Sequence, residues 1–461
     1  MKVPLESAIA ATQASLCDPD GAPATLRVST DTRALQPGDT FLALRGERYD
    51  GHDFADEAVR RGAAMLVLER SAARVPGTPT MLVEETGRAY MALAGAARSL
   101  FHGRVVAITG STGKTTTKAF LTQLLAAKYG DRVLAAPGNE NNEIGVSRLL
   151  LQASDAAHDV LVVEMGARRY GDVEALVEIA RPQVGILTNV GEAHLEVMGS
   201  REQLAETKWG LFSRGAGAVL NADDRISRER ASTLARPAHW FAAGPDDGSL
   251  ERYAQLQTLT ALIGAKRLLR RVENRTHSSE VCVLVAGPYN RANVAAAIAG
   301  ALELQVPLEA LAAKLPNLQL PQGRYDSIAL QGGVRLIYDA YNANASSMIA
   351  ALDAFAAETA SRRIAVLASM AELGDESETL HERVGAYAAG KVDVLLVQGE
   401  FATELARGAE RAGLSSAQIV RVAANSQAAR WLREHARSGD VILLKGSRKY
   451  KLEEIVEELR A

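Results

Sequence analysis

The stretch Thr109-Gly110-Ser111-Thr112-Gly113-Lys114-Thr115-Thr116-Thr117 decides the fold class of this chain. It follows the apolar run Val105-Val106-Ala107-Ile108 and opens a segment with helical spacing that ends near Tyr129. A strand, a glycine loop and a helix in this order surround phosphate oxygens with backbone N–H groups and a helix N-terminus. We therefore expect Lys114 to reach the β- and γ-phosphates of a nucleotide and the Thr115 hydroxyl to bind Mg²⁺.

The glycine loop is shorter than the ordinary phosphate loop, whose pattern is Gly-x-x-x-x-Gly-Lys. Only two residues stand between its glycines, and a chance turn explains Gly-Lys-Thr after an apolar strand poorly. The short spacing thus reduces the number of nucleotide-binding families to which the chain could belong. The residues expected to contact phosphate are Gly110, Ser111, Thr112, Gly113, Lys114, Thr115 and Thr116.

Composition sets the broad class of protein. A length of 461 residues suggests about three domains, and 47% hydrophobic with 23% charged residues is ordinary for a globular protein. A net charge of −3 argues against a nucleic-acid partner. Cys17 and Cys282 lack metal-ligand spacing, which favours a reducing compartment. With no signal sequence and no apolar run near ~18 residues, the chain is expected to be cytosolic, with no membrane span.

The order of apolar runs predicts an α/β protein of three domains. The first, residues 1–102, is expected to be a small mixed α/β unit. The second, residues 103–316, should hold a mainly parallel sheet of the phosphate-loop type, and the third, residues 317–461, a Rossmann-like open sheet. Two such sheets on one chain leave a crevice between them for ligands.

Particular segments support this division. The strands expected lie at 40–44, 64–68, 105–108, 160–163, 185–187, 218–220, 336–338, 364–367, 394–397 and 441–444. The helices expected lie at 53–61, 87–100, 172–180 and 201–212. From 241 to 280 the signal weakens, and polar alternation predicts irregular strands.

Two further strands of the central region end in polar residues. Val160 to Val163 is followed by Glu164, and Gly185 to Leu187 is followed by Asn189 and His194. Carboxyl ends of parallel strands are where such sheets bind ligands, and Mg²⁺ takes one or two carboxylates besides phosphate oxygens. Glu164 is therefore the best candidate metal carboxylate, while for His194 a metal role and a structural role remain equally open.

Other polar residues have more than one interpretation. Asn290 and Asn293 stand three apart at a helix start and share a face. Asn290 either caps the helix or reads a base edge together with Asn293. The amide-rich loop from Asn139 to Gly145 suits neither a core nor plain solvent. For Lys208, the sequence spacing alone predicts only a solvated side chain.

Taken together, these motifs resemble the ATP-dependent Mur ligases of peptidoglycan synthesis, with folylpolyglutamate synthase as a distant relative. The shortened loop, the strand ending at Glu164, Asn189 through His194, the Asn290/Asn293 pair and Gly323-Arg324 carry the resemblance. Three stretches are similar to the branch that adds D-alanyl-D-alanine to UDP-N-acetylmuramoyl-tripeptide. The first runs from Ser29-Thr30-Asp31-Thr32-Arg33 through Gly38-Asp39 and Gly46-Glu47-Arg48-Tyr49-Asp50-Gly51-His52. The others are Tyr338-Asp339-Ala340-Tyr341-Asn342-Ala343-Asn344 and Lys445-Gly446-Ser447-Arg448.

The resemblance implies a role for each matching residue. It implies that ATP is the nucleotide and that two Mg²⁺ ions are bound, with Thr115, Glu164, His194 and Lys208 around them and Lys208 carbamylated. It places Asn142 by an acyl phosphate, Arg324 at a phosphate, Asp339 at the ribose, and Asn290 and Asn293 at the adenine. The implied substrate contacts are Ser29, Thr30 and Arg33 for the UDP end, and Tyr341, Asn342, Lys445, Ser447 and Arg448 for D-alanyl-D-alanine.

The implied reaction is an ATP-dependent amide ligation through an acyl phosphate, by a monomer acting on two small-molecule substrates. A MurE-type ligase is one alternative, but the Asp-Asn-Pro-Arg motif usual in that branch is absent. A folylpolyglutamate synthase and a non-catalytic ATP-binding module are the others. The chain departs from the family pattern at Tyr289, where histidine is frequent, and at Ala345, where proline is usual.

Overall fold

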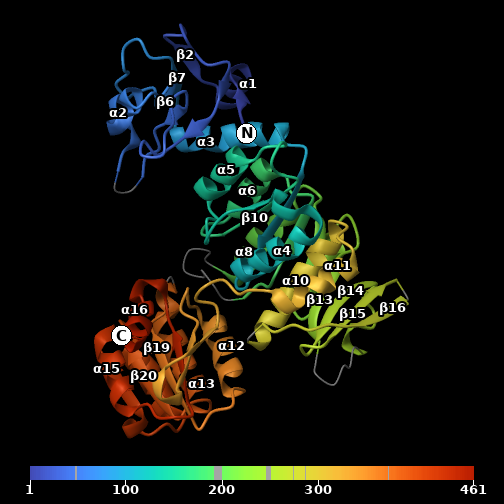
Figure 1. The fold of residues 1–461 in the computed structure, drawn as a ribbon, viewed down its shortest axis with the longest axis vertical. Helices are drawn as coiled ribbons and strands as arrows, with labels where there is room; N and C mark the ends of the chain where they lie inside the picture. The colour runs from blue at the N-terminus through green and yellow to red at the C-terminus, as the bar shows by residue number, and fades with distance from the viewer. Residues whose placement is uncertain are drawn as a thin grey trace.

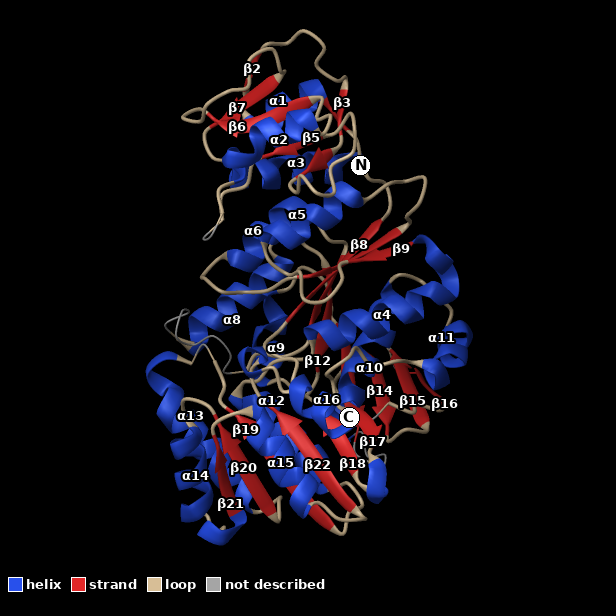
Figure 2. Ribbon diagram, turned by 60° about the vertical axis from the view of Figure 1, so that its left-hand side comes forward, coloured by secondary structure: helices blue, strands red, loops and turns tan. Residues whose placement is uncertain are grey.

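The three larger β-sheets of the described residues follow one another along the long axis of the molecule in a computed structural model of the chain (Figure 1). The N-terminal sheet lies at one end and the C-terminal sheet at the other, with the largest sheet between them (Figure 2). The structure describes residues 1–46, 49–191, 200–244, 251–273, 275–285, 287–371 and 373–460. Within this described part, no helix is long and apolar enough to cross a membrane.

The N-terminal unit is a five-stranded sheet in the order β2-β7-β6-β5-β4. Its pairs are parallel except β2 with β7, and β1 and β3 form a separate antiparallel pair. The strands are β1 (Val3–Pro4), β2 (Ser15–Cys17), β3 (Thr25–Leu26), β4 (Val28–Ser29), β5 (Thr40–Leu42), β6 (Met65–Glu69) and β7 (Thr80–Val83). The helices are α1 (Leu5–Thr12), α2 (Ala55–Arg60) and α3 (Thr86–Leu100).

The central unit contains a nine-stranded sheet in the order β16-β15-β14-β13-β12-β11-β8-β10-β9. Its strands are β8 (Arg104–Thr109), β9 (Val133–Ala135), β10 (Val160–Glu164), β11 (Val184–Leu187), β12 (Gly217–Asn221), β13 (His239–Gly244), β14 (Thr258–Ile263), β15 (Arg267–Val272) and β16 (Arg275–Glu280). Its helices are α4 (Lys114–Tyr129), α5 (Glu143–Gln152), α6 (Asp172–Ala180), α8 (Arg201–Trp209), α9 (Arg225–Arg230), α10 (Pro288–Glu303) and α11 (Leu308–Lys314).

Both faces of the parallel strands β8, β10 and β11 are buried, which explains why these strands read as continuous apolar runs. Along β8, Val105 and Ala107 belong to the core beneath α3, α5 and α6, whereas Val106 and Ile108 belong to the core beneath α4 and α10. Helix α3 of the N-terminal unit packs on α5 and α6 of the central unit. The N-terminal unit is therefore joined to the central one through a shared apolar layer.

The region from 241 to 280 corrects the sequence prediction. We expected irregular strands, but β13, β14, β15 and β16 are regular. Strand β13 pairs in parallel with β14, and β14 to β16 form an antiparallel meander. The signal was weak because β16, at the sheet edge, is almost wholly exposed and has no apolar alternation.

The C-terminal unit is a six-stranded sheet in the order β17-β18-β22-β19-β20-β21, parallel except for β17 with β18. Its strands are β17 (Asp326–Ala329), β18 (Arg335–Tyr338), β19 (Arg362–Ala368), β20 (Val394–Gln398), β21 (Ile419–Val422) and β22 (Asp440–Lys445). Its helices are α12 (Ala345–Ala356), α13 (Ser377–Ala389), α14 (Ala402–Arg411), α15 (Asn425–His435) and α16 (Glu453–Arg460). Separate apolar clusters cover its two faces.

The predicted fold class is confirmed: a mixed α/β N-terminal unit, a mainly parallel central sheet and a Rossmann-like C-terminal sheet. The glycine loop follows β8 and the helix after it, α4, ends at Tyr129 as expected. Helix α6 spans the predicted 172–180.

Candidate functional site

The glycine loop joins β8 to α4, and the end of β11 holds it in place. Gly110 has φ +148° and Gly113 has φ +82°, conformations that favour glycine. A Cβ on Gly110 would collide with the Thr188 hydroxyl, and a Cβ on Gly113 with the Asn293 side chain. The Asn189 side chain accepts from Thr112 N at 3.1 Å and donates to Thr112 Oγ1 at 2.8 Å. Asn189 thus shapes the loop rather than facing outward.

Two lysines near the loop are shielded from solvent, Lys114 partly and Lys208 almost completely. Lys114 Nζ donates to Gly110 O at 2.7 Å, and burial lowers the pKa of this ammonium, opposed by the charge of Glu164. Lys208 on α8 is only 1% exposed and has no hydrogen bond or ion pair within the described residues. Burial, followed by the charge of Lys114, lowers the pKa of Lys208 well below its ordinary value. The prediction from spacing alone that the Lys208 side chain is solvated is therefore wrong.

The Glu164 carboxylate is buried, 1% exposed, and three donors surround it. Oε1 accepts from Thr115 Oγ1 at 3.2 Å and from Asn141 Nδ2 at 2.9 Å. Oε2 faces Lys118 Nζ at 3.2 Å but receives no hydrogen bond of good geometry. Glu164 thus brings a buried carboxylate oxygen, Oε1, to the Thr115 hydroxyl, and oxygen ligands of this kind suit Mg²⁺.

The residues at Glu164 fit Mg²⁺. The 3.2 Å between Thr115 Oγ1 and Glu164 Oε1 is close to the ~3 Å edge of an octahedron with Mg–O bonds of about 2.1 Å. Mg²⁺ usually completes its shell with water and substrate phosphates, so it needs no cage of carboxylates. Among the described residues, no three His, Cys, Asp or Glu side chains are grouped so that they alone could hold a metal ion.

A cavity of about 170 Å³, here called the loop cavity, lies over the glycine loop. Its central-unit lining includes Lys114, Thr115 and Glu164, and its C-terminal lining includes Arg324 and Tyr341. The Arg324 guanidinium lies 4.4 Å from the centroid of the Tyr341 ring, and its buried Nε has no hydrogen-bond partner among the described residues. Two units of the chain therefore bring cations to one polar cavity.

A second cavity of about 170 Å³, the α10 cavity, opens on the other side of the loop. Asn293, Arg324, Asp339 and Lys445 line it. Asn290 and Asn293 do share a face of α10, since Asn293 Nδ2 donates to Asn290 Oδ1 at 3.1 Å. Asn290 is fully buried and Asn293 reaches the cavity.

The side chain of Lys445 is committed to the protein itself. Its ammonium donates to Asp339 O at 3.0 Å and Asn342 O at 2.9 Å, and pairs with Asp339 Oδ2 at 3.1 Å. Tyr289 OH donates to the same carboxylate at 3.3 Å, and burial raises the pKa of this phenol well above its usual range. Lys445 therefore braces the backbone at 339–342.

The third cavity, about 550 Å³, is named the tyrosine cavity after Tyr338 and Tyr341. It lies at the carboxyl ends of β18, β19 and β22, where open α/β sheets bind ligands. It gathers four of the predicted substrate residues and adjoins the loop cavity, with which it shares part of its lining. The predicted residues are Tyr341, Asn342, Ser447 and Arg448, and the shared ones are Asn139, Tyr341, Asn342, Ala343 and Asn344.

The fourth cavity, about 260 Å³ and named the arginine cavity after Arg168 and Arg169, leads toward the N-terminal unit. Met91 of α3 and Asn142 also line it. Arg168 lines the loop cavity as well, and neither arginine has an ion pair within the described residues. The Asn142 Oδ1 atom caps α5 by accepting from Gly145 N at 2.9 Å, which leaves its amide N–H groups for a ligand.

The predicted UDP-end residues lie at the end of β4, in the N-terminal unit. Arg33 is exposed and pairs with Asp31 at 2.8 Å, which lowers the pKa of Asp31 to about 2. Ser29 Oγ donates to Asp31 O at 3.2 Å, and Thr30 is half-buried. These residues line none of the cavities at the glycine loop. His194 lies outside the described residues.

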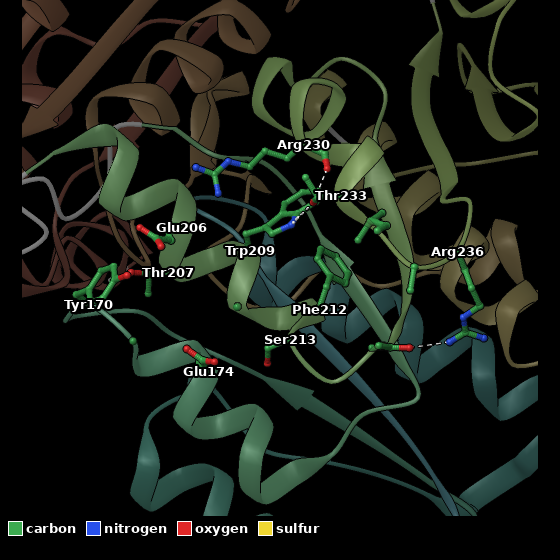
Figure 3. A pocket seen from close by; sticks show the side chains of 16 residues that line it. Tyr170, Glu174, Glu206, Thr207, Trp209, Phe212, Ser213, Arg230, Thr233 and Arg236 are labelled. Atoms are coloured by element: carbon green, nitrogen blue, oxygen red, sulfur yellow. Dashed lines mark hydrogen bonds between the residues drawn. The ribbon is translucent and has the colours of Figure 1, made fainter.

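A fifth cavity, about 510 Å³, contains none of the predicted residues (Figure 3). Trp209 and Phe212 form its aromatic wall, with ring centroids 5.1 Å apart, and Trp209 Nε1 donates to Thr233 Oγ1 at 3.2 Å. Arg230 and Glu206 lie at its rim (Figure 3). The predicted residues at and around the glycine loop line the other four cavities instead.

Sequence reasoning missed Lys118, Asn141, Arg168 and Thr188. Lys118 stands four residues after Lys114, on the same helical face, and this spacing was an available signal. Thr188 precedes Asn189 at the end of β11 and donates to Thr112 O at 2.6 Å. Asn141 and Arg168 acquire their positions only through the loops after β9 and β10.

Comparison with known proteins identifies the class. The chain matches the Mur ligase family, catalytic domain, over residues 27–91, the Mur ligase middle domain over residues 108–301, and the Mur ligase, glutamate ligase domain over residues 323–448. Relatives at 34% and 36% identity cover 94% and 95% of it. The chain belongs to the Mur ligase family, whose members are ATP-dependent ligases.

Two particular relatives are each named UDP-N-acetylmuramoyl-tripeptide--D-alanyl-D-alanine ligase. The Escherichia coli (strain K12) protein is 36% identical over 449 residues, covering 95% of each chain. The Synechocystis protein is 34% identical over 443 residues, covering 94% of this chain and 92% of the relative. The fold is similar to a crystal structure of MurF from Acinetobacter baumannii, with TM-score 0.86, 27% identity and coverage of 100% and 99%. It is also similar to MurF ligase from Thermotoga maritima in complex with ADP, with TM-score 0.80, 29% identity and coverage of 94% and 97%.

Proposed function

We propose that this chain is the ligase that joins D-alanyl-D-alanine to UDP-N-acetylmuramoyl-tripeptide, with ATP converted to ADP and phosphate. One observation carries the proposal: the loop cavity and the tyrosine cavity adjoin through shared residues of two units. An acyl phosphate formed at the glycine loop would then lie beside the cavity for the incoming amine. The relatives named for this reaction match over nearly the whole chain.

The nucleotide is assigned to the loop cavity and the α10 cavity. Lys114 and the backbone of the glycine loop bind the β- and γ-phosphates, and Arg324 adds a cation from the C-terminal unit. Asn293, supported by Asn290, contacts the adenine, and Asp339 the ribose. This assignment is supported by the α10 cavity, which Asn293, Arg324 and Asp339 line together. Asn290 is fully buried and does not line the cavity.

Two Mg²⁺ ions complete the proposed site. Thr115 and Glu164 would hold one of them, and Mg²⁺ there neutralises phosphate charge during transfer. Lys208, once carbamylated, and His194 would help to hold the second. Burial without a partner among the described residues favours carbamylation, because the neutral amine is the form that attacks CO₂. An N–C bond forms, one C=O π bond of CO₂ opens to give the carboxylate oxygen, and one N–H proton leaves. We expect a ¹³C carbamate resonance after equilibration with ¹³C-bicarbonate, and none in Lys208→Arg.

The tripeptide substrate is assigned to a path from the N-terminal unit to the glycine loop. Ser29, Thr30 and Arg33 take the UDP end, and the arginine cavity receives the peptide. Arg168 lines both the arginine cavity and the loop cavity, so it would meet the carboxylate about to react. The amide of Asn142 would stabilise the acyl phosphate.

D-alanyl-D-alanine is assigned to the tyrosine cavity. Tyr341, Asn342, Ser447 and Arg448 line it, and a guanidinium is well suited to a terminal carboxylate. Lys445 supports this site indirectly by bracing Asn342. In this proposal Lys445 does not contact the dipeptide directly, as the resemblance implied, but supports Asn342, which does.

The reaction then has two steps. A carboxylate oxygen of the tripeptide attacks the γ-phosphorus of ATP, a P–O bond forms, and the bond to the β-phosphate oxygen breaks to release ADP. The dipeptide amine attacks the acyl carbon, a C–N bond forms, phosphate leaves and the amine loses a proton. Charge neutralisation and positioning supply the catalysis, and closure of the C-terminal unit excludes water. The proposed units are residues 1–102, 103–316 and 317–461, in a cytosolic monomer.

The test uses purified protein with UDP-N-acetylmuramoyl-tripeptide, D-alanyl-D-alanine, ATP and Mg²⁺. We expect phosphate release coupled to formation of the pentapeptide product. Phosphate release without peptide product, or neither, would contradict the proposal. Replacing the dipeptide by diaminopimelate, lysine or glutamate, with the matching acceptor, tests the MurE-type and folylpolyglutamate synthase alternatives. Retention of full biological activity by Lys114→Ala would favour a non-catalytic ATP-binding module.

A further inference from the structure

Lys118 is a buried cation that the proposed reaction does not use. It lies on α4, four residues after Lys114, and only 4% of it is exposed. Its ammonium contacts two groups from different segments. Nζ lies 3.2 Å from Glu164 Oε2 and donates to Gly138 O at 2.6 Å.

The two oxygens of Glu164 have different surroundings. Oε1 is held by Thr115 and Asn141, whereas Oε2 faces Lys118. Lys118 therefore contacts one carboxylate oxygen and Thr115 the other, so that Thr115 Oγ1 and Oε1 stay together. Removing one partner from a buried ion pair is costly because the other charge stays buried and uncompensated.

The second contact of Lys118 reaches the amide-rich loop. Gly138 precedes Asn139, which lines both the tyrosine cavity and the loop cavity. The same loop continues to Asn141, which contacts Glu164, and to Asn142, which lines the arginine cavity. One ammonium group thus ties the candidate metal carboxylate to the loop that borders three of the cavities.

We propose that Lys118 is a positioning residue that holds Glu164 and the 138–142 loop in the arrangement that accepts the Mg²⁺–nucleotide complex. The inference rests on the proposed function, since it assigns Mg²⁺ and nucleotide to this site. Groups that orient a metal ligand without touching the metal commonly change metal affinity by about 10–100-fold when removed. Lys118 occupies such a place through Glu164.

The experiment measures ADP binding by calorimetry at a series of Mg²⁺ concentrations and without Mg²⁺. In Lys118→Met we expect Mg²⁺-dependent ADP binding to weaken by about 10–100-fold, with metal-free ADP binding unchanged. The matched control is Lys128→Met on the same helix, where the ammonium donates to the backbone at Leu304 O and Gln305 O, each at 3.2 Å, and lies 5.0 Å from the centroid of the Tyr129 ring. This variant should change neither measurement.

Other outcomes separate the possibilities. Equal weakening with and without Mg²⁺, or unchanged Mg²⁺ dependence, overturns the role of Lys118 while leaving the proposed function intact. No ADP binding by the unmodified protein overturns the proposed function itself. In a Glu164→Gln background, Lys118→Met should add no further loss of Mg²⁺ dependence, and additive losses overturn the coupling. If Lys118→Met does not fold, Lys118→Gln provides the same comparison with a smaller change in side-chain shape.

Discussion

Backbone conformation at single glycines sets the shape of the phosphate loop. Gly110 and Gly113 both adopt positive φ, and each approaches a polar side chain so closely that a Cβ would collide with it. The two obstructing groups, Thr188 and Asn293, come from distant parts of the chain. The loop is therefore fitted to its neighbours as well as to a ligand.

We predict that Gly110→Ala weakens ADP binding roughly tenfold or more, because strain of 1–3 kcal/mol must be relieved by moving the loop. Isothermal calorimetry measures the affinity. Gly390→Ala is the matched control, since Gly390 has φ −84° and nothing lies near its added Cβ. An affinity for Gly110→Ala equal to that of the control would show that the loop tolerates a side chain.

A second prediction concerns pH and the pair His239–Glu303, whose atoms Nδ1 and Oε1 lie 2.8 Å apart. The hydrogen bond from His239 lowers the pKa of Glu303. A carboxyl with a lowered folded pKa stabilises above its unfolded pKa, and this is lost as pH falls through the folded value. Glu303→Gln should therefore cost about 1 kcal/mol near neutral pH, a modest value because the Glu303 side chain is 37% exposed.

Urea unfolding of both proteins across the acid range checks this prediction. The difference in free energy of unfolding between the unmodified protein and Glu303→Gln should shrink as pH drops below about 4.5, the ordinary pKa of Glu. It should vanish below the lowered folded pKa. A difference that persists or grows in acid would mean that Glu303 stabilises the fold through packing and not through its charged pair with His239.

At the scale of elements, helix α5 begins at a residue with two tasks. Asn142 Oδ1 caps the helix, and the same side chain borders the arginine cavity. Aspartate keeps a capping oxygen but has no amide N–H, whereas alanine lacks both. The two substitutions therefore separate helix stability from ligand contact.

We predict that Asn142→Asp keeps the stability of the protein while Asn142→Ala loses about 1 kcal/mol. Both should lower kcat by about 10²-fold, because each removes a donor to the proposed acyl phosphate. Unfolding curves and steady-state rates measure the two effects. Full activity in Asn142→Asp would restrict Asn142 to capping.

Much of the fold was predictable because its buried parallel strands read as apolar runs between helical segments. Strand β21 was missed, since Arg421 interrupts its apolar residues, and the regularity of β16 was missed because the strand is exposed. In the site, the phosphate loop and Glu164 followed from spacing and strand order. Lys118 did not, because a lysine on a helix appears solvated until its neighbours in space are known.

At the scale of the whole molecule, the central and C-terminal units together line the proposed nucleotide site. The α10 cavity takes residues from the glycine loop, from α10 and from the end of β18. A ligand there would restrain both units, whereas the N-terminal sheet contributes no lining residue to this cavity. Nucleotide binding should therefore restrain the central and C-terminal units and leave the N-terminal sheet unaffected.

We predict that Mg²⁺–ADP slows hydrogen exchange at the 110–117 loop and at 339–342, and leaves β5, β6 and β7 unchanged. ADP at 100 times its Kd should also stabilise the fold by about 2.7 kcal/mol. Exchange mass spectrometry with and without ligand gives the pattern. Protection confined to the central unit would place the nucleotide away from Asp339.

The exposed strand β16 has a consequence for the protein at high concentration. It ends the nine-stranded sheet with unpaired backbone groups, which invite a strand from another molecule. Its side chains, Arg275-Thr276-His277-Ser278-Ser279-Glu280, are polar or charged throughout. Charge and hydrophilicity at this border disfavour sheet extension between molecules, so the same residues that obscured the strand in the sequence protect the protein from aggregation.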